Sequence, residues 1–379
     1  MKLIKLLFII ALFIGCNNSK KSEDSTSDST PSESVKKWLS MKGDGSMPHV
    51  VLVSGDEEYR SEEALPQLAK ILSQRHGFKC TVLFAQDPQK PGIVDPNYTN
   101  NIPGLDQLQS ADMMIIFTRF RALPDSQMKF IDDYLKSGKP VIGMRTSTHA
   151  FNFQKIDFDS KYKRYGNFYQ GEDEWKDGFG RLVLGEKWIS HHGRHGNQST
   201  RGITATGAEG HPILNGIEEG EIWGPSDVYG VRLPLPGDAQ HIVLGQVVDR
   251  TADFDENDPL LGMRPSDSKL PGSITKKNKK GEEIEMDQND PMMPIAWTKT
   301  YQLPGGQQGK SFATTAGAST DLLSEGTRRM MINAVFWCLD LDVPAKANVD
   351  LVGVYEPTRF AFLKDSIWDN RNLKISSLE

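Results

Sequence analysis

The chain has 379 residues, of which 37% are hydrophobic and 25% charged, and its formal net charge at pH 7 is −6. The hydrophobic fraction is enough for a sizeable core in one large domain or two small ones. An acidic chain without a dense basic segment is a poor binder of nucleic acid, so we expect no nucleic-acid partner.

The cysteine content excludes a further class of site. Besides Cys16, only Cys80 and Cys338 are present, and each lies inside an apolar stretch. Two cysteines cannot hold a cysteine-based metal cluster. We expect both to be buried free thiols, with a disulfide between them as the alternative.

The N-terminus has the pattern of an export signal. Lys2 and Lys5 precede an uncharged apolar run at residues 6–14, which is too short to span a bilayer as a helix. The run ends in LFIGC, which resembles a lipobox, the site at which bacteria attach lipid to a cysteine. We therefore predict a signal peptide at residues 1–15 and lipidation of Cys16, so that a membrane is a partner through the lipid. An ordinary signal peptide with a chance cysteine is the alternative.

The segment that follows has the composition of a tether. Residues 17–34 are rich in Ser, Asp, Glu and Lys, which is typical of a solvated linker. We expect a lipid anchor and flexible linker at residues 16–47, an α/β domain at residues 48–345 and a C-terminal extension at residues 346–379. The protein would then lie in the bacterial cell envelope, on the periplasmic face or at the cell surface.

The first half of the domain alternates between strands and helices. Ser61 is expected to cap a helix whose apolar residues recur at helical spacing, and residues 125–137 are expected to form a second helix. Strands and helices alternate at βαβ spacing, so we predict an α/β fold with a doubly wound parallel sheet and helices on both faces. Four apolar runs predict its buried strands, at residues 49–54, 78–84, 113–117 and 140–144.

The second half is less regular. Short apolar runs predict further strands at residues 188–191, 242–248 and 295–298, and a closing helix at residues 325–339. Residues 253–290 combine dense charge with prolines and show no periodicity. This pattern predicts a surface insertion, either a mobile loop or a lid.

Polar and ionisable side chains follow three of the predicted strands. In open α/β sheets, ligands bind outside the carboxyl ends of the strands, so we expect these side chains to line a site. They are Asp56, Glu57, Glu58 and Tyr59 after the first strand, Arg119 after the third, and Arg145, Ser147 and His149 after the fourth.

Several segments resemble the trehalose-utilisation-like (ThuA-like) domain family. They occur in the family's order and cover most of residues 49–344; among them are VLVSGDEEYRSEEALPQLAKIL, FTRFRALPDSQ, GKPVIGMRTSTHAF and HHGRHGNQSTRG. The resemblance implies a flavodoxin-like α/β layer similar to that of class I glutamine amidotransferases, which agrees with the predicted sheet. It also implies a role in carbohydrate catabolism.

The turn after the fourth predicted strand lacks the nucleophile of an amidotransferase. In those enzymes this turn carries a cysteine, whereas here it reads RTSTH, from Arg145 to His149. Cys80 and Cys338 lie in a predicted strand and a predicted helix, so we exclude thiol-based glutamine hydrolysis. Ser147 is an alternative nucleophile, although it lacks the flanking glycines of the G-x-S-x-G motif.

Three histidines lie within five residues, namely His191, His192 and His195. Imidazole suits proton transfer near neutral pH, so one interpretation is metal-free acid–base catalysis or sugar binding. Another is a divalent metal site, with His149 as a further ligand and Asp56 or Glu58 as the carboxylate. The third is structural, with one histidine in the core and two bonded to loop backbone.

Arginines and aromatic side chains complete the predicted site. Arg119 and Arg145 are expected on neighbouring segments, where they would recognise hydroxyls or a carboxylate of the substrate, or pair with carboxylates of the protein. Tyr59 offers a flat ring of the kind on which sugars stack. The segment WGPSDVY, with Trp223 and Asp227, is a further substrate-binding candidate because its glycine and proline favour a loop.

We therefore predict a membrane-anchored extracytoplasmic protein that processes a sugar or oligosaccharide. The favoured reaction is proton transfer on a sugar or an oxidised sugar, with His191, His192 or His195 as the base. Arg145 and Asp56 complete the predicted catalytic set. The alternatives are a non-catalytic carbohydrate-binding lipoprotein and a glycoside hydrolase that uses the carboxylates after the first strand. No cofactor is certain from the sequence, and a divalent metal stays an open alternative.

Overall fold

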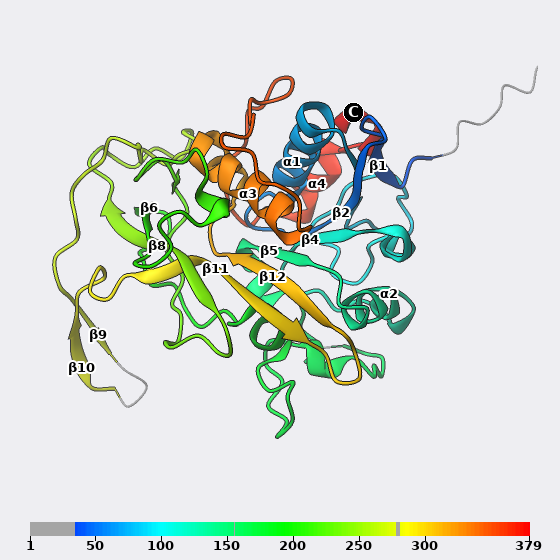
Figure 1. The fold of residues 1–379 in the computed structure, drawn as a ribbon, viewed down its shortest axis with the longest axis horizontal. Coiled ribbons are helices and arrows are strands. Elements are labelled where there is room, and N and C mark those ends of the chain that lie inside the picture. The colour runs from blue at the N-terminus through cyan, green and yellow to red at the C-terminus, as the bar shows by residue number, and fades with distance from the viewer. Residues whose placement is uncertain (1–34, 155, 278–280) are drawn as a thin grey trace, which may run out of the picture. The chain divides into compact units, whose positions relative to one another are not determined.

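The centre of the fold is a parallel sheet with the strand order β3-β2-β4-β5-β12. The computed structural model describes residues 35–379 except 155 and 278–280, and Figure 1 shows their arrangement. All four strands predicted in the first half are present and pair in parallel, and β12 continues the sheet beyond β5. The doubly wound α/β fold is thus confirmed. The bounds are β2 Met47–Gly55, β3 Phe78–Phe84, β4 Met113–Thr118, β5 Val141–Met144 and β12 Gln308–Thr314.

Antiparallel strands extend the sheet at both edges. The predicted strands at residues 242–248 and 295–298 lie inside β8 and β11. The predicted strand at residues 188–191 is wrong, since this segment makes one isolated bridge, between His191 and Tyr229. The ladder stops there because two successive backbone N–H groups, those of His192 and Gly193, both donate to the Val228 carbonyl. The bounds are β1 Trp38–Met41, β6 Gln198–Thr204, β7 Trp223–Gly224, β8 Gln240–Asp249 and β11 Met293–Gln302.

Helices cover both faces of the parallel sheet. In Figure 1, α1 (Ser61–His76), α3 (Glu325–Cys338) and α4 (Asp365–Arg371) lie on one side of the central strands, and α2 (Asp125–Lys136) lies on the other. The predicted helices at residues 125–137 and 325–339 are thus confirmed. Because both faces are covered, the strands can be apolar along their whole length.

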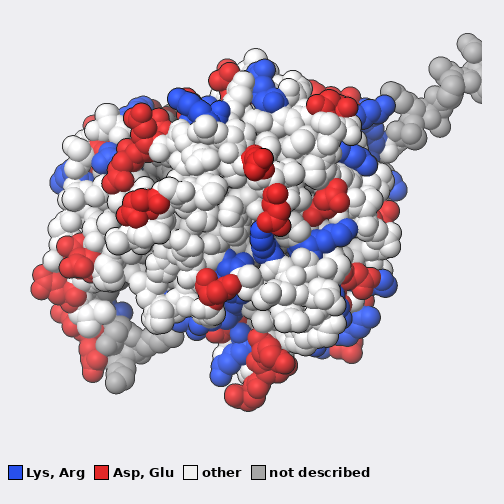
Figure 2. Space-filling model, viewed as in Figure 1, with Lys and Arg blue, Asp and Glu red and all other residues white. Residues whose placement is uncertain are grey.

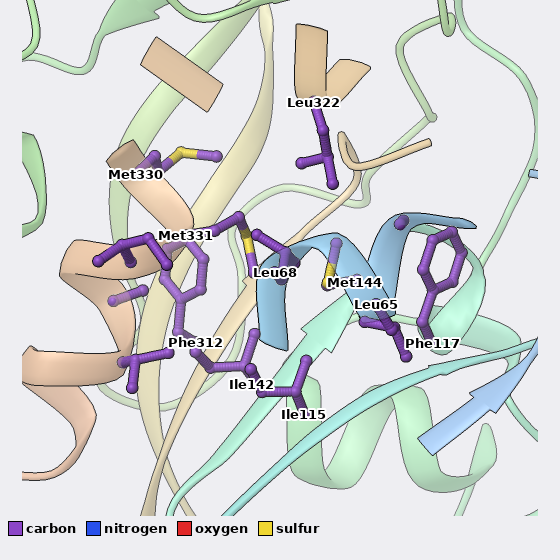
Figure 3. Packing of buried hydrophobic residues seen from close by; sticks show 14 of the residues in the cluster. Leu65, Leu68, Ile115, Phe117, Ile142, Met144, Phe312, Leu322, Met330 and Met331 are labelled. Atoms are coloured by element: carbon purple, nitrogen blue, oxygen red, sulfur yellow. The ribbon is translucent and has the colours of Figure 1, made fainter. Parts of the chain in front are cut away.

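Alternate residues of the central strands pack into two separate cores. Figure 3 shows the core under α1 and α3, in which Ile115, Ile142 and Phe312 point to the same side of the sheet. The neighbouring residues Met114 and Val141 belong to the second core, together with residues of α2. Side chains alternate across a strand, so a continuous apolar run supplies both layers. The sheet is thereby a rigid support for the loops at its carboxyl edge.

The start of α1 differs by one residue from the prediction. Ser61 is the first helical residue, and the N-cap is Arg60, which has a left-handed backbone (φ 61°). The Ser61 hydroxyl instead lies 2.8 Å from the Ser54 hydroxyl and accepts a hydrogen bond from Asp56 N at 3.0 Å. It therefore ties the helix to the end of β2, where the predicted site begins.

Two segments that we expected outside the domain belong to it. Residues 38–41 fall in the predicted linker, yet they form the edge strand β1. The predicted C-terminal extension packs back on the domain, with Phe360, Trp368 and Ile375 almost fully buried. The compact unit of the described chain therefore runs from Val35 to Glu379. Both segments add buried hydrophobic side chains to the domain.

The charged insertion is partly regular. Two of its segments, β9 (Ile274–Lys277) and β10 (Glu283–Met286), pair as an antiparallel hairpin separate from the main sheet. On the face shown in Figure 2, acidic side chains gather around this hairpin, and acidic and basic side chains are interspersed elsewhere. Near the end of the insertion Gln288 is buried, and its backbone carbonyl forms a hydrogen bond with His192, which is described below.

The predictions for the N-terminus lie outside the described residues. This holds for the signal peptide, for the lipidation of Cys16 and for the tether up to residue 34. Within the residues that the structure describes, no helix combines the length and the apolar character needed to cross a membrane.

Candidate functional site

The polar side chains at the carboxyl edge of the sheet converge on Asp227. Its carboxylate is fully buried and lies 2.9 Å from Arg145 Nη2, 2.8 Å from His191 Nδ1 and 3.1 Å from His195 Nδ1. The tyrosine hydroxyl of Tyr59 accepts from Arg145 at 3.0 Å and lies 3.3 Å from His195 Nδ1. These five side chains come from four separate stretches of sequence, and we call them the Asp227 cluster.

Backbone contacts between two loops place the histidines against Asp227. The loop before β6 carries His191 and His195, and the loop after β7 carries Asp227. Besides the bonds to Val228, the N–H of Gly230 donates to the carbonyl of Ser190. A Cβ atom on Gly193 would lie only 3.2 Å from the Cβ of Asp227, so a glycine lets the loops approach this closely.

Arg145 is the buried support of the Asp227 cluster. It follows β5 directly with a left-handed backbone (φ 44°) and opens the short 3-10 helix Arg145–His149. Its guanidinium lies between two aromatic rings, 4.3 Å from the centre of Tyr59 and 3.9 Å from that of Tyr229. It also donates to the carbonyls of Asp227 and Thr315. Fully buried and bonded to the protein, Arg145 holds Asp227 in place, which matches the alternative of an arginine that pairs with a carboxylate of the protein.

The left-handed backbone at Arg145 raises the question of whether this turn presents a nucleophile. A sharp turn directly after a central strand is where nucleophile-elbow enzymes present their reactive side chain. Here that position holds a guanidinium, which cannot act as a nucleophile. Ser147, the predicted alternative, is buried and donates to the Ile116 carbonyl at 2.5 Å. The geometry therefore offers no nucleophile at this turn.

Asp227 is ionised in the folded protein. Burial by itself would raise the pKa of its carboxyl group. The hydrogen bonds from His191 and His195 and the charge of Arg145 outweigh this effect and hold the pKa far below its ordinary value. An ionised carboxylate only accepts hydrogen bonds, so each of the two histidines donates a hydrogen bond from Nδ1–H to Asp227.

The two histidines bound to Asp227 are accessible to a ligand. The side chains of His191 and His195 are each 37% exposed. Since Nδ1 is engaged with Asp227, Nε2 is the nitrogen through which each ring can exchange a proton with a ligand. The Nε2 atom of His195 lies 3.6 Å from Glu58 Oε1, so a carboxyl group stands next to this exchange position.

Glu58 has the environment of a proton donor. Burial and then the negative charge of Asp56 raise its pKa to about 7, although the charges of Arg119, His195 and Arg145 act in the opposite direction. A carboxyl group with this pKa carries its proton in a large share of molecules at neutral pH. It can therefore donate a hydrogen bond or a proton to a neighbouring ligand.

Asp56 is a structural residue rather than the catalytic or metal-binding carboxylate that we predicted. It is fully buried, and its carboxylate accepts hydrogen bonds from the backbone N–H groups of Glu58 and Tyr59 and from the Thr146 hydroxyl. These bonds shape the loop after β2 and engage both carboxylate oxygens of Asp56. Asp56 and Glu58 therefore do not form the pair of facing carboxyl groups that a glycoside hydrolase needs.

Arg119 lies at the rim of the cluster. It pairs with Glu57, and its Nε lies 3.3 Å from Glu58 Oε2. A second arginine, Arg121, is fully buried and also pairs with Glu57. With its side chain 20% exposed, Arg119 can contact a ligand, unlike the buried Arg121 and Arg145.

Three predicted residues make no hydrogen bond to Asp227. His192 points to the opposite side from His191, and its Nε2 lies 2.8 Å from the Gln288 carbonyl. Trp223 is buried in the hydrophobic core beside α3. His149 is buried with its ring 4.8 Å from Phe120, and burial lowers its pKa well below the ordinary value, so it stays neutral.

Two further residues join the site. Tyr229, the last residue of the predicted WGPSDVY segment, stacks on Arg145. Phe360, from the predicted C-terminal extension, packs on the ring of Tyr59 at 5.3 Å and on that of His195 at 5.1 Å. The N–H of Ala361 donates to the carbonyl of Glu58. No local sequence pattern could have indicated that this part of the C-terminal segment lines the site.

A metal ion has one candidate position among the described residues. One ligand atom from each of His191, His195 and Asp227 lies within 4.8 Å of the others. The carboxylate of the triad is therefore Asp227, and not Asp56 or Glu58 as we predicted. His149 is not part of the triad.

Comparison with known proteins gives limited information. No family model matches the chain, and no curated protein matches it in sequence. A solved structure described as ThuA-like, from Parabacteroides merdae ATCC 43184, is similar at 14% identity and a TM-score of 0.41, over 84% of this chain and 98% of that one. Another, from Bacteroides uniformis ATCC 8492, has 13% identity and a TM-score of 0.42, over 77% and 92%. Similarity at this level carries no conclusion about function.

Proposed function

We propose that the protein is an enzyme that transfers protons on a carbohydrate, with His191 and His195 as its acid–base pair. One observation carries the proposal: two half-exposed histidines donate Nδ1 hydrogens to a single buried carboxylate. A carboxylate in this position fixes the tautomer of an imidazole and stabilises its protonated form, which makes Nε2 a stronger base. A buried aspartate with only a structural role would not need two exposed imidazoles.

The chemistry that suits this arrangement is proton abstraction next to a carbonyl group, or from a hydroxyl group, of a sugar. One histidine takes the proton through Nε2. The second histidine or Glu58 returns a proton to another atom of the reacting group of the sugar. Arg145 acts through Asp227, because its guanidinium keeps the carboxylate ionised while the histidines change their charge.

Aromatic side chains beside the histidines support a carbohydrate as the substrate. Trp188 is half-buried, with its ring 5.8 Å from that of His191. Phe120 and Phe362 hold the Arg119 guanidinium between them, at 4.9 Å and 4.7 Å from the ring centres, and Phe362 is 59% exposed. A pyranose ring combines an apolar C–H face with hydroxyl groups, so it fits flat rings that stand next to an arginine and a carboxylate.

Solvent-proton exchange tests the proposal without knowledge of the product. A panel of free and oxidised sugars is incubated with the protein in D₂O, and deuterium at carbon is followed by NMR. We expect one sugar class to exchange, and His191→Asn or His195→Asn to slow its exchange by about 10² or more with little change in melting temperature.

His241→Asn is the matched control for these variants. His241 is a half-buried histidine near the start of β8, whereas the opposite end of that strand carries Asp249, which pairs with Arg194 beside the cluster. Exchange should be unchanged in this variant. Normal exchange in the double variant His191→Asn, His195→Asn would refute the acid–base role, and sugar binding without any exchange would indicate a binding protein.

We also propose that lipid at Cys16 anchors the protein in the cell envelope. The support is the sequence of residues 1–16 alone. Replacement of Cys16 by Ser should release the protein from membranes or block its maturation, because one cysteine carries the lipid. Fractionation tests this, and a Cys16→Ser protein that stays in the membrane pellet after an alkaline wash would contradict it.

A further inference from the structure

We propose that His191, His195 and Asp227 bind one divalent transition-metal ion. The inference concerns the same residues as the proposed function and describes their metal-bound state, in which Nε2 carries the imidazole hydrogen and does not act as the base. The ion would sit between the two imidazoles and Asp227 Oδ2, at the exposed side of the Asp227 cluster.

The spacing of the three side chains fits a single ion. His191 Nδ1 lies 2.8 Å from Asp227 Oδ2, His195 Nδ1 lies 3.1 Å from Oδ1, and one ligand atom of each residue lies within 4.8 Å of the others. Nitrogen and oxygen ligands bind zinc at about 2.0–2.2 Å in tetrahedral geometry, which separates neighbouring ligand atoms by roughly 3–3.5 Å. A small rotation of the half-exposed imidazoles therefore closes the triad around an ion.

The charges at this edge of the sheet allow a cation in spite of Arg145. The positive charge of Arg145 opposes the binding of a cation to Asp227. The guanidinium bonds Oδ1, however, so the ion can bind at Oδ2, the oxygen that His191 faces. The surrounding side chains contain more carboxyl groups than guanidiniums. The carboxyl groups are Asp56, Glu57, Glu58, Asp227 and Asp321, and the guanidiniums are Arg119, Arg121 and Arg145.

The ligand set indicates the class of metal. Two imidazoles and one carboxylate favour zinc, manganese, iron or cobalt, whereas magnesium and calcium prefer oxygen ligands alone. Three protein ligands leave coordination positions for water or for oxygen atoms of a substrate, as in catalytic rather than structural sites. The exposure of both rings, 37% each, leaves the position open to solvent.

Metal binding and the hydrogen bonds to Asp227 exclude each other at Nδ1. When an ion occupies Nδ1, the hydrogen of each neutral imidazole moves to Nε2, which then donates instead of accepting. The Nε2 atom of His195 faces Glu58 Oε1 at 3.6 Å, so an acceptor is already present for that hydrogen. Such a carboxylate behind a ligating histidine is a common partner in metal sites.

Metal titration of the whole protein tests the inference. The chain is stripped with a chelator, dialysed and titrated with Zn²⁺ and Co²⁺, with calorimetry and the visible absorption of Co²⁺ as readouts. We expect one equivalent to bind. His191→Ala and His195→Ala should each weaken binding by at least about tenfold, since even residues that only support metal ligands have effects of that size. His241→Ala is the matched control and should bind as the wild type does.

The readouts separate this inference from the proposed function. Both substituted histidines are half-exposed, so the variants should keep the wild-type circular dichroism spectrum. Failure of the folded wild type to bind a stoichiometric ion, or binding that survives His191→Ala and His195→Ala, would overturn the metal site. Deuterium exchange by the stripped protein at the full rate would then leave the acid–base proposal standing without a metal.

Discussion

The parallel half of the sheet and the loops joined to its antiparallel half both contribute ionisable side chains to the Asp227 cluster and its surroundings, but in opposite ways. Asp56 and Arg145 follow parallel strands, are at most 1% exposed and bond to the protein itself. His191 and His195 precede the antiparallel strand β6 and are 37% exposed. Asp227, which follows β7, lies between the two groups.

The two groups of side chains differ in role: the buried group supports the site, and the exposed group can take part in chemistry. The carboxyl edge of a parallel sheet is the expected location for a site, and it is the location found here. The side chains that come directly after the parallel strands nevertheless act mainly as a scaffold, because the neighbouring loops cover them. The most exposed side chains of the site, His191 and His195, come from a loop without regular structure, which the scaffold holds in place, whereas Glu58 and Arg119 lie at its rim. Substitutions in the two groups should therefore have different consequences.

The largest effect on stability is expected for Arg145. Arg145→Met removes one partner of a fully buried ion pair and leaves Asp227 charged, which should lower the free energy of unfolding by about 3–5 kcal/mol. Urea unfolding measures it. Arg264→Met, which breaks the exposed pair with Asp258, is the control and should cost at most about 1 kcal/mol. Equal losses in the two variants would show that Arg145 is not part of the scaffold.

A smaller loss of stability is expected for Asp56. Asp56→Ala leaves the N–H groups of Glu58 and Tyr59 and the Thr146 hydroxyl without their acceptor, which should cost about 2–3 kcal/mol. Metal binding by the folded fraction should persist, because the triad carboxylate is Asp227. Loss of the metal with unchanged unfolding would reverse these roles.

Lys299 on β11 provides a pH-dependent test in the antiparallel half. Burial lowers the pKa of its ammonium group to about 8. A lysine with a lowered folded-state pKa contributes its stability above the unfolded-state pKa, and this contribution is lost as the pH falls through about 8. Lys299→Met should therefore gain about 2 kcal/mol relative to the wild type between pH 9.5 and pH 7.

Unfolding in urea at the two pH values measures the gain for Lys299→Met. The exposed Lys310, which pairs with Asp340, supplies the control Lys310→Met. Lys310→Met should not show this gain. A pH-independent difference for Lys299→Met would mean that the lysine is solvated in the folded protein.

The smallest effect is expected from the thiols. Cys80 and Cys338 are free and buried, as predicted, and burial raises the pKa of both well above the ordinary value. Both should resist thiol reagents in the native state and react once the chain is denatured. Sugar exchange should survive treatment of the native protein. Rapid modification of either thiol without unfolding would contradict their place in the core.

The sequence pattern was sufficient for four of the five parallel strands, β12 being missed, and for the general place of the site. Strands buried on both faces appear as continuous apolar runs, so β2, β3, β4 and β5 could be read directly. The absence of a thiol after β5 could also be read directly. In each case the property belongs to a short stretch of chain, and its physical cause is local.

The roles of the individual side chains depended on contacts between distant parts of the chain. His191 and His192 are neighbours in sequence, yet one reaches Asp227 and the other reaches Gln288. Asp56 and Asp227 are both buried aspartates in loops, and only their hydrogen-bond partners distinguish the loop support from the centre of the site. Phe360 joins the site because the C-terminal segment packs back on the domain. These are long-range packing contacts, which hydrophobic periodicity does not encode, and they exist only once the two halves of the sheet have assembled.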